Sequence, residues 1–328
     1  MAGTTLLALV LGASALRAQT HVLVISGVGG EAKYSAQFKE LGSSLSQALH
    51  ARFAIPDSDI AWLSEDSTDK SPYHRGLASG QNIERAVDRI AKSSKADDQI
   101  VFVLIGHGIP EGAESKLAIP GPDLTVKDYA RLLGRFASQR VAFVNLSTAS
   151  GDMLPLVAGP NRVVITATKT SFERNELVFA QYFVEALAKE GADVDKDGRV
   201  SLLEAFTYAN TETKRHYDDA STLRTEHAQM NDTGDGKADP DPTGRGDGSG
   251  LMARRFYLDA GKAATQAVMN NPELSRLYKL RFSLEDQVDS LKKQKSKMTP
   301  DAYDTALEKV LLDLARTSLA IRKMEGRE

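Results

Sequence analysis

The chain of 328 residues contains no cysteine. This absence excludes disulfide bonds, thiolate metal sites and a thiol nucleophile. An excess of charge of either sign is also lacking, because 41 basic residues against 44 acidic ones give a formal net charge of -3. There is no polybasic run. This balance argues against binding of nucleic acid or of an anionic lipid surface, since both require concentrated positive charge.

Long hydrophobic runs are scarce. The apolar stretch from Thr4 to Ala15 is shorter than the ~20 residues that a helix needs to cross a bilayer, so we expect no membrane span. Residues 1–18 instead resemble a signal peptide with small residues at plausible cleavage points, although lysine and arginine are missing from its first part. The sequence therefore predicts an exported protein, either periplasmic or secreted.

Hydrophobic residues make up 41% of the chain, enough for one large α/β domain and an appendage. Apolar runs alternate with segments of helical spacing, and this alternation predicts a mostly parallel sheet covered by helices on both faces. Strands are expected at 21–26, 59–63, 100–105, 141–145 and 162–168, and helices at 34–53, 82–93, 125–136, 176–188 and 202–214.

Three of the expected strands run into short loops that carry glycine, histidine or hydroxyl groups. The first strand is followed by Gly27, the strand at 100–105 by His107, and the strand at 141–145 by a turn that contains Thr148. Functional groups gather at the carboxyl ends of strands in parallel sheets. We therefore expect these loops to form one candidate site.

A strand that ends in Gly-His-Gly and a later strand that ends in Ser-Thr-Ala-Ser-Gly resemble the catalytic half of the caspase and legumain peptidases (clan CD). The chain is most similar to the bacterial legumain-like branch, over about residues 21 to 258. The resemblance implies a caspase-like three-layer sandwich. It implies that His107 is the acid–base residue, that the Gly108 amide belongs to an oxyanion hole, and that Thr148 replaces the cysteine nucleophile. The position that is acidic in legumain-like enzymes holds Leu146.

The replacement of cysteine by Thr148 weakens the nucleophile. A thiol with a pKa of ~8.5 is readily ionised beside an imidazolium, whereas an internal threonine hydroxyl needs a strong and well-aligned base. Ser147 and Ser150 are alternative hydroxyls, and Ser150 suits a role in the turn. We expect a pseudopeptidase that binds peptides or proteins. The alternative is an active peptidase or other hydrolase that uses His107 with Thr148 or a nearby serine.

An EF-hand pattern spans residues 193–204, with Gly198 at the sharp turn. The ligands expected for Ca²⁺ are Asp193, Asp195, Asp197, the carbonyl of Arg199, Ser201 and Glu204. Because no partner loop is found, a structural clamp is favoured over a sensor. A second acidic loop at 231–241 is followed by Pro242 where the final ligand would stand, so it can offer only a looser Ca²⁺ contact. His227 is a candidate ligand or turn residue.

The composition changes from Glu273 onward. Two apolar stripes at helical spacing predict an antiparallel helical hairpin or coiled coil over residues 261–328, joined to a main domain at 19–260. The stripes contain Leu277, Leu280, Leu284, Val288 and Leu291, then Tyr303, Leu307, Val310, Leu314 and Ile321. Residues 256–258 are expected to close the main domain at an edge. A further alternative is a Ca²⁺-stabilised assembly module that oligomerises through the hairpin.

Overall fold

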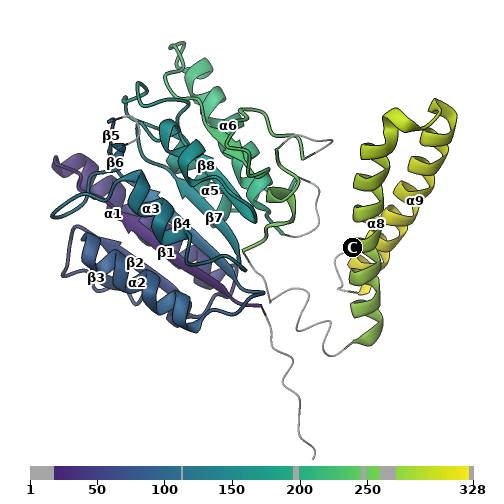
Figure 1. The fold of residues 1–328 in the computed structure, drawn as a ribbon, viewed down its shortest axis with the longest axis horizontal. Helices are drawn as coiled ribbons and strands as arrows, with labels where there is room; N and C mark the ends of the chain where they lie inside the picture. The colour runs from purple at the N-terminus through teal and green to yellow at the C-terminus, as the bar shows by residue number, and fades with distance from the viewer. Residues whose placement is uncertain (1–17, 112–113, 195–198, 245–248, 259–270, 325–328) are drawn as a thin grey trace, which may run out of the picture.

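The computed structural model describes residues 18–111, 114–194, 199–244, 249–258 and 271–324. Within them the chain forms a seven-stranded sheet with helices on both faces, followed by two long helices (Figure 1). The predicted fold class is confirmed as an α/β three-layer sandwich with a mostly parallel sheet and a C-terminal helical hairpin, and this arrangement is consistent with a caspase-like sandwich. The signal-peptide prediction concerns residues that lie outside the described part of the chain, except for Ala18.

The strand order of the sheet is β3-β2-β1-β4-β7-β8-β9, and only β9 runs antiparallel to its neighbour. The strands are β1 (Thr20–Ser26), β2 (Ile60–Ser64), β3 (His74–Leu77), β4 (Gln99–Ile105), β7 (Arg140–Asn145), β8 (Arg162–Thr166) and β9 (Gln229–Asn231). The central strands β1 and β4 are buried along their whole length. Their continuous apolar sequence is what a strand needs when both of its faces are covered.

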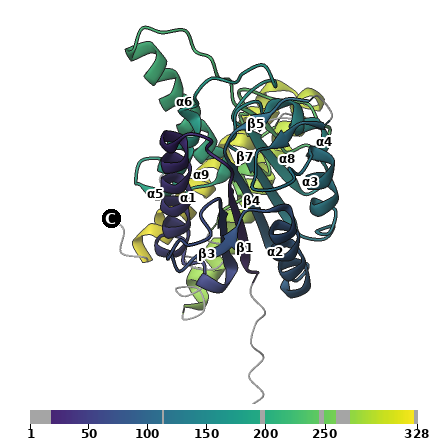
Figure 2. The ribbon, with the colours of Figure 1, turned by 90° about the vertical axis from the view of Figure 1, so that its left-hand side faces the viewer.

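Helices cover both faces of the sheet (Figure 2), and a hydrophobic cluster lies between the sheet and each helical layer. One cluster joins the sheet to α1 (Ala32–Ala51), α5 (Phe179–Ala188) and α6 (Leu202–Asp219), and the other joins it to α2 (Gly80–Ser93), α3 (Val126–Leu133) and α4 (Leu154–Val157). Side chains along a strand alternate between the two clusters, as in Phe102 and Val103 of β4. The expected apolar faces of α1 and α2 are both buried, which confirms their predicted orientation.

The shortest elements differ from the sequence-based expectation. The strands β3 and β9 were not expected, nor was the small antiparallel pair β5 (Gly108–Ile109) and β6 (Lys116–Leu117). The strand β9, rather than residues 256–258, closes the sheet beside β8, and Tyr257 makes only a single bridge to Ser201. Strands of two to four residues carry too little periodic pattern to be recognised in a sequence.

The hairpin consists of α8 (Pro272–Gln294) and α9 (Pro300–Met324), which pack against each other. The predicted stripe of α9 is buried or half-buried. In α8 one prediction was wrong: Leu280 is 44% exposed, and the contact with α9 is made by Leu274, Leu277, Leu284, Val288 and Leu291. The stripe of α8 differs from the expected one because residues on one helix face follow each other after either three or four positions. The spacing alone therefore does not decide which of two neighbouring residues is buried. None of the described helices combines the length and apolarity that a bilayer crossing requires.

Candidate functional site

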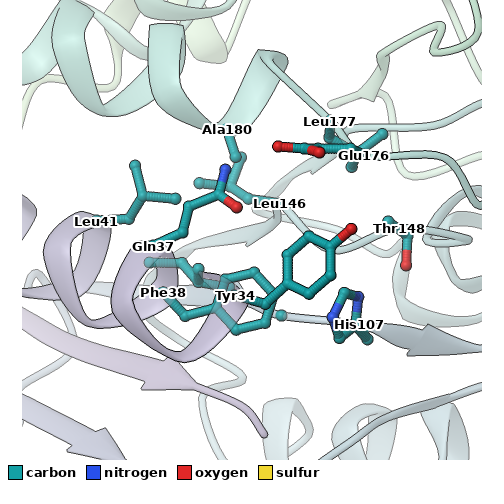
Figure 3. Close-up of a pocket in the computed structure, with 12 residues that line it drawn as sticks. Tyr34, Gln37, Phe38, Leu41, His107, Leu146, Thr148, Glu176, Leu177 and Ala180 are labelled. Carbon is teal, nitrogen blue, oxygen red and sulfur yellow. The ribbon is translucent and has the colours of Figure 1, made fainter. Parts of the chain in front are cut away.

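The strands that precede the two candidate loops are direct neighbours in the sheet. β4 pairs in parallel with β7, so His107 and Thr148 emerge at the same carboxyl edge. Both residues line one hollow, together with residues of α1 and of the segment that leads into α5 (Figure 3). The structure thus brings together the residues that the sequence placed in one site.

The two loops approach each other at Gly108. Its N–H donates a hydrogen bond to Thr148 Oγ1 over 3.0 Å, and the Thr148 N–H donates to the carbonyl of Gly106 over 3.4 Å. A β-carbon on Gly108 would lie 1.9 Å from the Thr148 carbonyl oxygen. Only glycine fits this approach, because real β-carbons keep more than 3 Å from such an atom. The amide expected in an oxyanion hole is therefore bonded to the hydroxyl at the nucleophile position.

The turn after Thr148 is strained. Ala149 is buried and has a φ of 53°, in the left-handed region that residues other than glycine rarely adopt. The hydrogen bond from its N–H to the carbonyl of Glu173, at 2.9 Å, helps to hold it there. Such backbone strain persists where the surrounding structure fixes it, and it is concentrated at functional sites.

The His107 ring lies against two aromatic side chains of α1. Its centroid is 4.8 Å from that of Tyr34 and 5.0 Å from that of Phe38, with both contacts edge-on. Within the described part of the chain, no hydrogen bond reaches either ring nitrogen of His107. A general base is normally oriented by a third group such as a carboxylate. Among the described residues, aromatic packing by Tyr34 and Phe38 holds this imidazole.

The neighbouring serines are not accessible nucleophiles. Ser147 Oγ donates to Asn145 Oδ1 over 2.6 Å, and Ser150 Oγ shares a hydrogen bond of 3.1 Å with the Thr168 hydroxyl. Ser147 is 1% exposed and Ser150 is fully buried. The structure supports the turn role expected of Ser150, and among the hydroxyls of residues 147, 148 and 150 it leaves that of Thr148 at the hollow.

The hollow is narrow and mainly apolar. Figure 3 shows Tyr34, His107 and Thr148 at one end, with Phe38 and Leu41 at the other. The volume of the hollow is about 20 Å³, which is room for about one water molecule. A peptide side chain could enter only if the lining residues moved. One of the apolar lining residues is Leu146. It was compared above with a position that is acidic in legumain-like enzymes.

Two features near the hollow had no clear signal in the sequence. Lys33 Nζ and Glu176 Oε2 form an ion pair of 2.6 Å that joins α1 to the segment before α5. Phe172, in the loop after β8, is 83% exposed although its neighbour Glu173 is bonded to the Thr148 turn. A phenylalanine in a predicted loop is a weak signal that the sequence does offer. An ion pair between residues 143 positions apart leaves no signal in the sequence.

The loop that carries Phe172 is anchored by His227. His227 Nδ1 lies 2.7 Å from Glu173 Oε1, and Glu173 Oε2 accepts hydrogen bonds from the backbone amides of His227 and Lys169. Of the two roles considered for His227, the structure supports a structural one: it joins the loop after β8 to the segment before β9.

Glu226, the residue before His227, is fully buried. It caps the start of α5, a helix that begins 47 residues earlier in the chain. Its carboxylate accepts hydrogen bonds from the backbone amides of Val178 and Phe179, at 2.9 and 3.0 Å, and from the hydroxyl of Tyr217. Burial raises the pKa of Glu226, and these hydrogen bonds oppose that effect. The carboxylate thereby fixes the start of α5, which supplies Ala180 to the hollow.

The predicted calcium loop lies between α5 and α6, and it is described only in part. Asp195 and Asp197 lie outside the described residues, while Asp193 and Arg199 border a polar hollow. Ser201 and Glu204 form a capping box at the start of α6. Glu204 Oε1 also accepts the Val194 N–H over 3.0 Å. The two ends of the loop are therefore already in contact through the side chain expected to be its bidentate ligand.

Carboxylates of the second acidic loop accept hydrogen bonds from other groups of the protein. Asp235 accepts hydrogen bonds from the backbone N–H of Lys237 and from the side chains of Thr233 and Asn231, and these bonds lower its pKa to about 2. Asp232 is buried and accepts three backbone amides of residues 250–253. Hydrogen bonds of this kind explain the acidic residues as turn-forming groups.

Comparisons with known proteins do not assign the chain to a family. No protein-family model matches it, and no curated protein does. A similar solved structure is protein GSU0716 from Geobacter sulfurreducens, with 11% sequence identity over 59% of this chain and 89% of that chain, and a TM-score of 0.37. A likeness this distant carries no argument, so the functional conclusion depends on the site itself.

Proposed function

We propose that this protein is an exported caspase/legumain-like pseudopeptidase that binds a peptide or protein segment without cleaving it. One observation supports this most strongly: the Gly108 N–H donates to Thr148 Oγ1. Acyl transfer requires a nucleophile activated by a base and separate N–H donors for the developing oxyanion. Here the donor and the hydroxyl satisfy each other, and His107 is held by aromatic packing rather than by a carboxylate.

Binding rather than cleavage is also favoured by the groups around the hollow. Phe172, on the loop that precedes Glu176, has an exposed apolar side chain. Glu176 lines the hollow and pairs with Lys33. The alternative of an active hydrolase is favoured by one specific observation, the presence of His107 and Thr148 in the same hollow.

Peptide turnover separates the two functions. We expect fluorogenic peptides with Asn, Asp or Arg before the scissile bond to show no turnover above that of His107→Ala and Thr148→Val, with or without Ca²⁺. Thr148→Val keeps the branched shape and removes only the hydroxyl. Turnover that disappears in both variants would establish the hydrolase and refute the pseudopeptidase.

The same labelled peptides, tested for equilibrium binding by fluorescence polarisation, probe the binding role. Gln37→Trp replaces a half-buried lining residue with a large ring that covers the hollow, and it should abolish binding. Gln47→Trp makes the same change at an exposed position of the same helix and should leave binding intact. Equal binding by both variants would locate recognition elsewhere on the protein.

We also propose that residues 193–204 bind Ca²⁺ as a structural clamp between α5 and α6. The pattern of oxygen ligands supports this, and so does the position of Glu204 at the third residue of α6, close to Val194. A ligand that binds only the folded state stabilises it. We expect saturating Ca²⁺ to raise the melting temperature by roughly 5 °C relative to EGTA.

Glu204→Gln provides the control for the calcium proposal. Glutamine can still close a capping box, but it offers one ligand oxygen instead of two. We expect this variant to fold and to lose most of the Ca²⁺-dependent rise, whereas Mg²⁺ should have little effect on either protein. An identical melting temperature for the unsubstituted protein in Ca²⁺ and in EGTA would contradict a calcium clamp.

A further inference from the structure

Among the side chains that the structure describes, the C-terminal hairpin has a small core of its own. Its two apolar clusters contain residues of α8 and α9 alone, and the larger one is built around Leu284, Val288 and Val310. The two helices span 23 and 25 residues. A pair of helices buries little apolar surface, and units of this size usually gain stability by association. The hairpin therefore has a physical reason to pack against further helices.

A second apolar stripe runs along α9 on the side away from α8. Leu312 is 49% exposed and follows the buried Val310 by two residues, while Leu319 is 61% exposed and follows the buried Thr317 by two residues. Two residues along a helix differ by about 200° in direction, so both leucines point away from the hairpin seam. They are seven residues apart, with the exposed Ala315 between them, and thus form one continuous stripe.

Charges flank this stripe in a self-complementary order. The exposed Glu308 lies before Leu312, and the exposed Lys323 lies after Leu319. Within the described part of the chain neither of them has an ion-pair partner. Arg316, near the middle, is already paired with Asp313 at 3.6 Å. The stripe therefore carries an acid at one end, a base at the other and leucines between them.

We infer that this face of α9 binds the same face of a second copy of the chain, in an antiparallel orientation. About a two-fold axis between residues 315 and 316, Leu312 of each copy meets Leu319 of the other. The same axis brings Glu308 of each copy to Lys323 of the other. The contact is isologous, as two-fold symmetry requires. The two hairpins then lie side by side, with both copies of α9 in the middle and both copies of α8 on the outside.

The parallel orientation is disfavoured by the same charges. It would place Glu308 against Glu308 and Lys323 against Lys323, and like charges across a helix interface oppose association. It would also bring the two Arg316 side chains together. The charge pattern therefore favours a second copy of the chain as the partner of this face of α9, and it favours the antiparallel orientation of the two helices.

The first test is the mass of the full chain by sedimentation at increasing concentrations, with helix content followed by circular dichroism. We expect dimers, and we expect Leu312→Ala or Leu319→Ala to raise the dissociation constant roughly tenfold or more. Leu311→Ala is the matched control, because Leu311 is 45% exposed on the same helix but lies about a quarter turn from the stripe. It should leave the dimer unchanged.

Charge reversal tests the orientation. Glu308→Lys alone should weaken the dimer, and adding Lys323→Glu to the same chain should restore it. In a parallel dimer the single reversal would merely exchange one like-charge pair for another and would not weaken association. The inference is overturned by a chain that stays monomeric at roughly 100 µM, by equal effects of Leu311→Ala and Leu312→Ala, or by a double reversal that fails to restore a weakened dimer.

Discussion

Gly108→Ala should lower the free energy of unfolding by about 4 kcal/mol. The new β-carbon would lie 1.9 Å from the Thr148 carbonyl oxygen and 3.0 Å from its carbonyl carbon. These are backbone atoms, and the neighbouring amides of Thr148 and Ala149 are hydrogen-bonded to Gly106 and Glu173, so the turn cannot retreat without losing those bonds. Overpacking of this kind typically costs 1–3 kcal/mol, and losing the bond to Thr148 Oγ1 adds about 1 kcal/mol.

Urea denaturation followed by circular dichroism measures this loss. Gly159→Ala is the matched control, because a β-carbon there meets only the Arg162 side chain, at 3.5 Å or more. We expect that control to stay within about 1 kcal/mol of the unsubstituted protein. If Gly108→Ala were as stable as Gly159→Ala, the close approach of the two loops, and with it the bond that blocks the Gly108 amide, would be wrong.

Glu226→Ala should cost roughly 3 kcal/mol of stability. The substitution removes the acceptor for the amides of Val178 and Phe179 and for the Tyr217 hydroxyl. A buried donor left without a partner costs about 1–3 kcal/mol, and loss of a helix cap costs about 1 kcal/mol. Because Ala180 follows these amides and lines the hollow, the variant should also weaken peptide binding.

Glu226→Gln separates the cap from the charge. Burial raises the pKa of Glu226 above its ordinary value, so the folded protein holds this proton more tightly than the unfolded chain does. The resulting contribution to stability is complete below the unfolded pKa and is lost as the pH rises through the folded pKa. Urea titrations should therefore show that the unsubstituted protein gains stability relative to Glu226→Gln when the pH falls from about 7 to about 4. A constant difference across that range would contradict the shift.

Much of the fold was predictable because its central elements are long and strongly patterned. The continuous apolar sequence of β4 needs cover on both faces, and the spacing of Phe38, Leu41 and Leu45 suits a helix with one buried side. The alternation of such elements predicted the parallel sheet. The position of His107 and Thr148 at one edge followed from that topology, since the ends of neighbouring parallel strands meet.

The state of the candidate site was not predictable in the same way. That the Gly108 amide bonds to Thr148, and that Tyr34 and Phe38 hold the His107 ring, depends on how separate segments approach in space. Nothing in the local sequence of Glu226 indicated that it would cap a helix that begins 47 residues earlier. In α8, the exposure of Leu280 was decided by the rotation of the helix against α9.

The sequence by itself determined that this protein has no thiol for catalysis and that its chain alternates between strands and helices, because composition and periodicity are properties of consecutive residues. Tertiary structure alone decided whether the Thr148 hydroxyl is free to react. A hydrogen bond between loops 40 residues apart is set by packing of the whole sheet, and no local pattern encodes it.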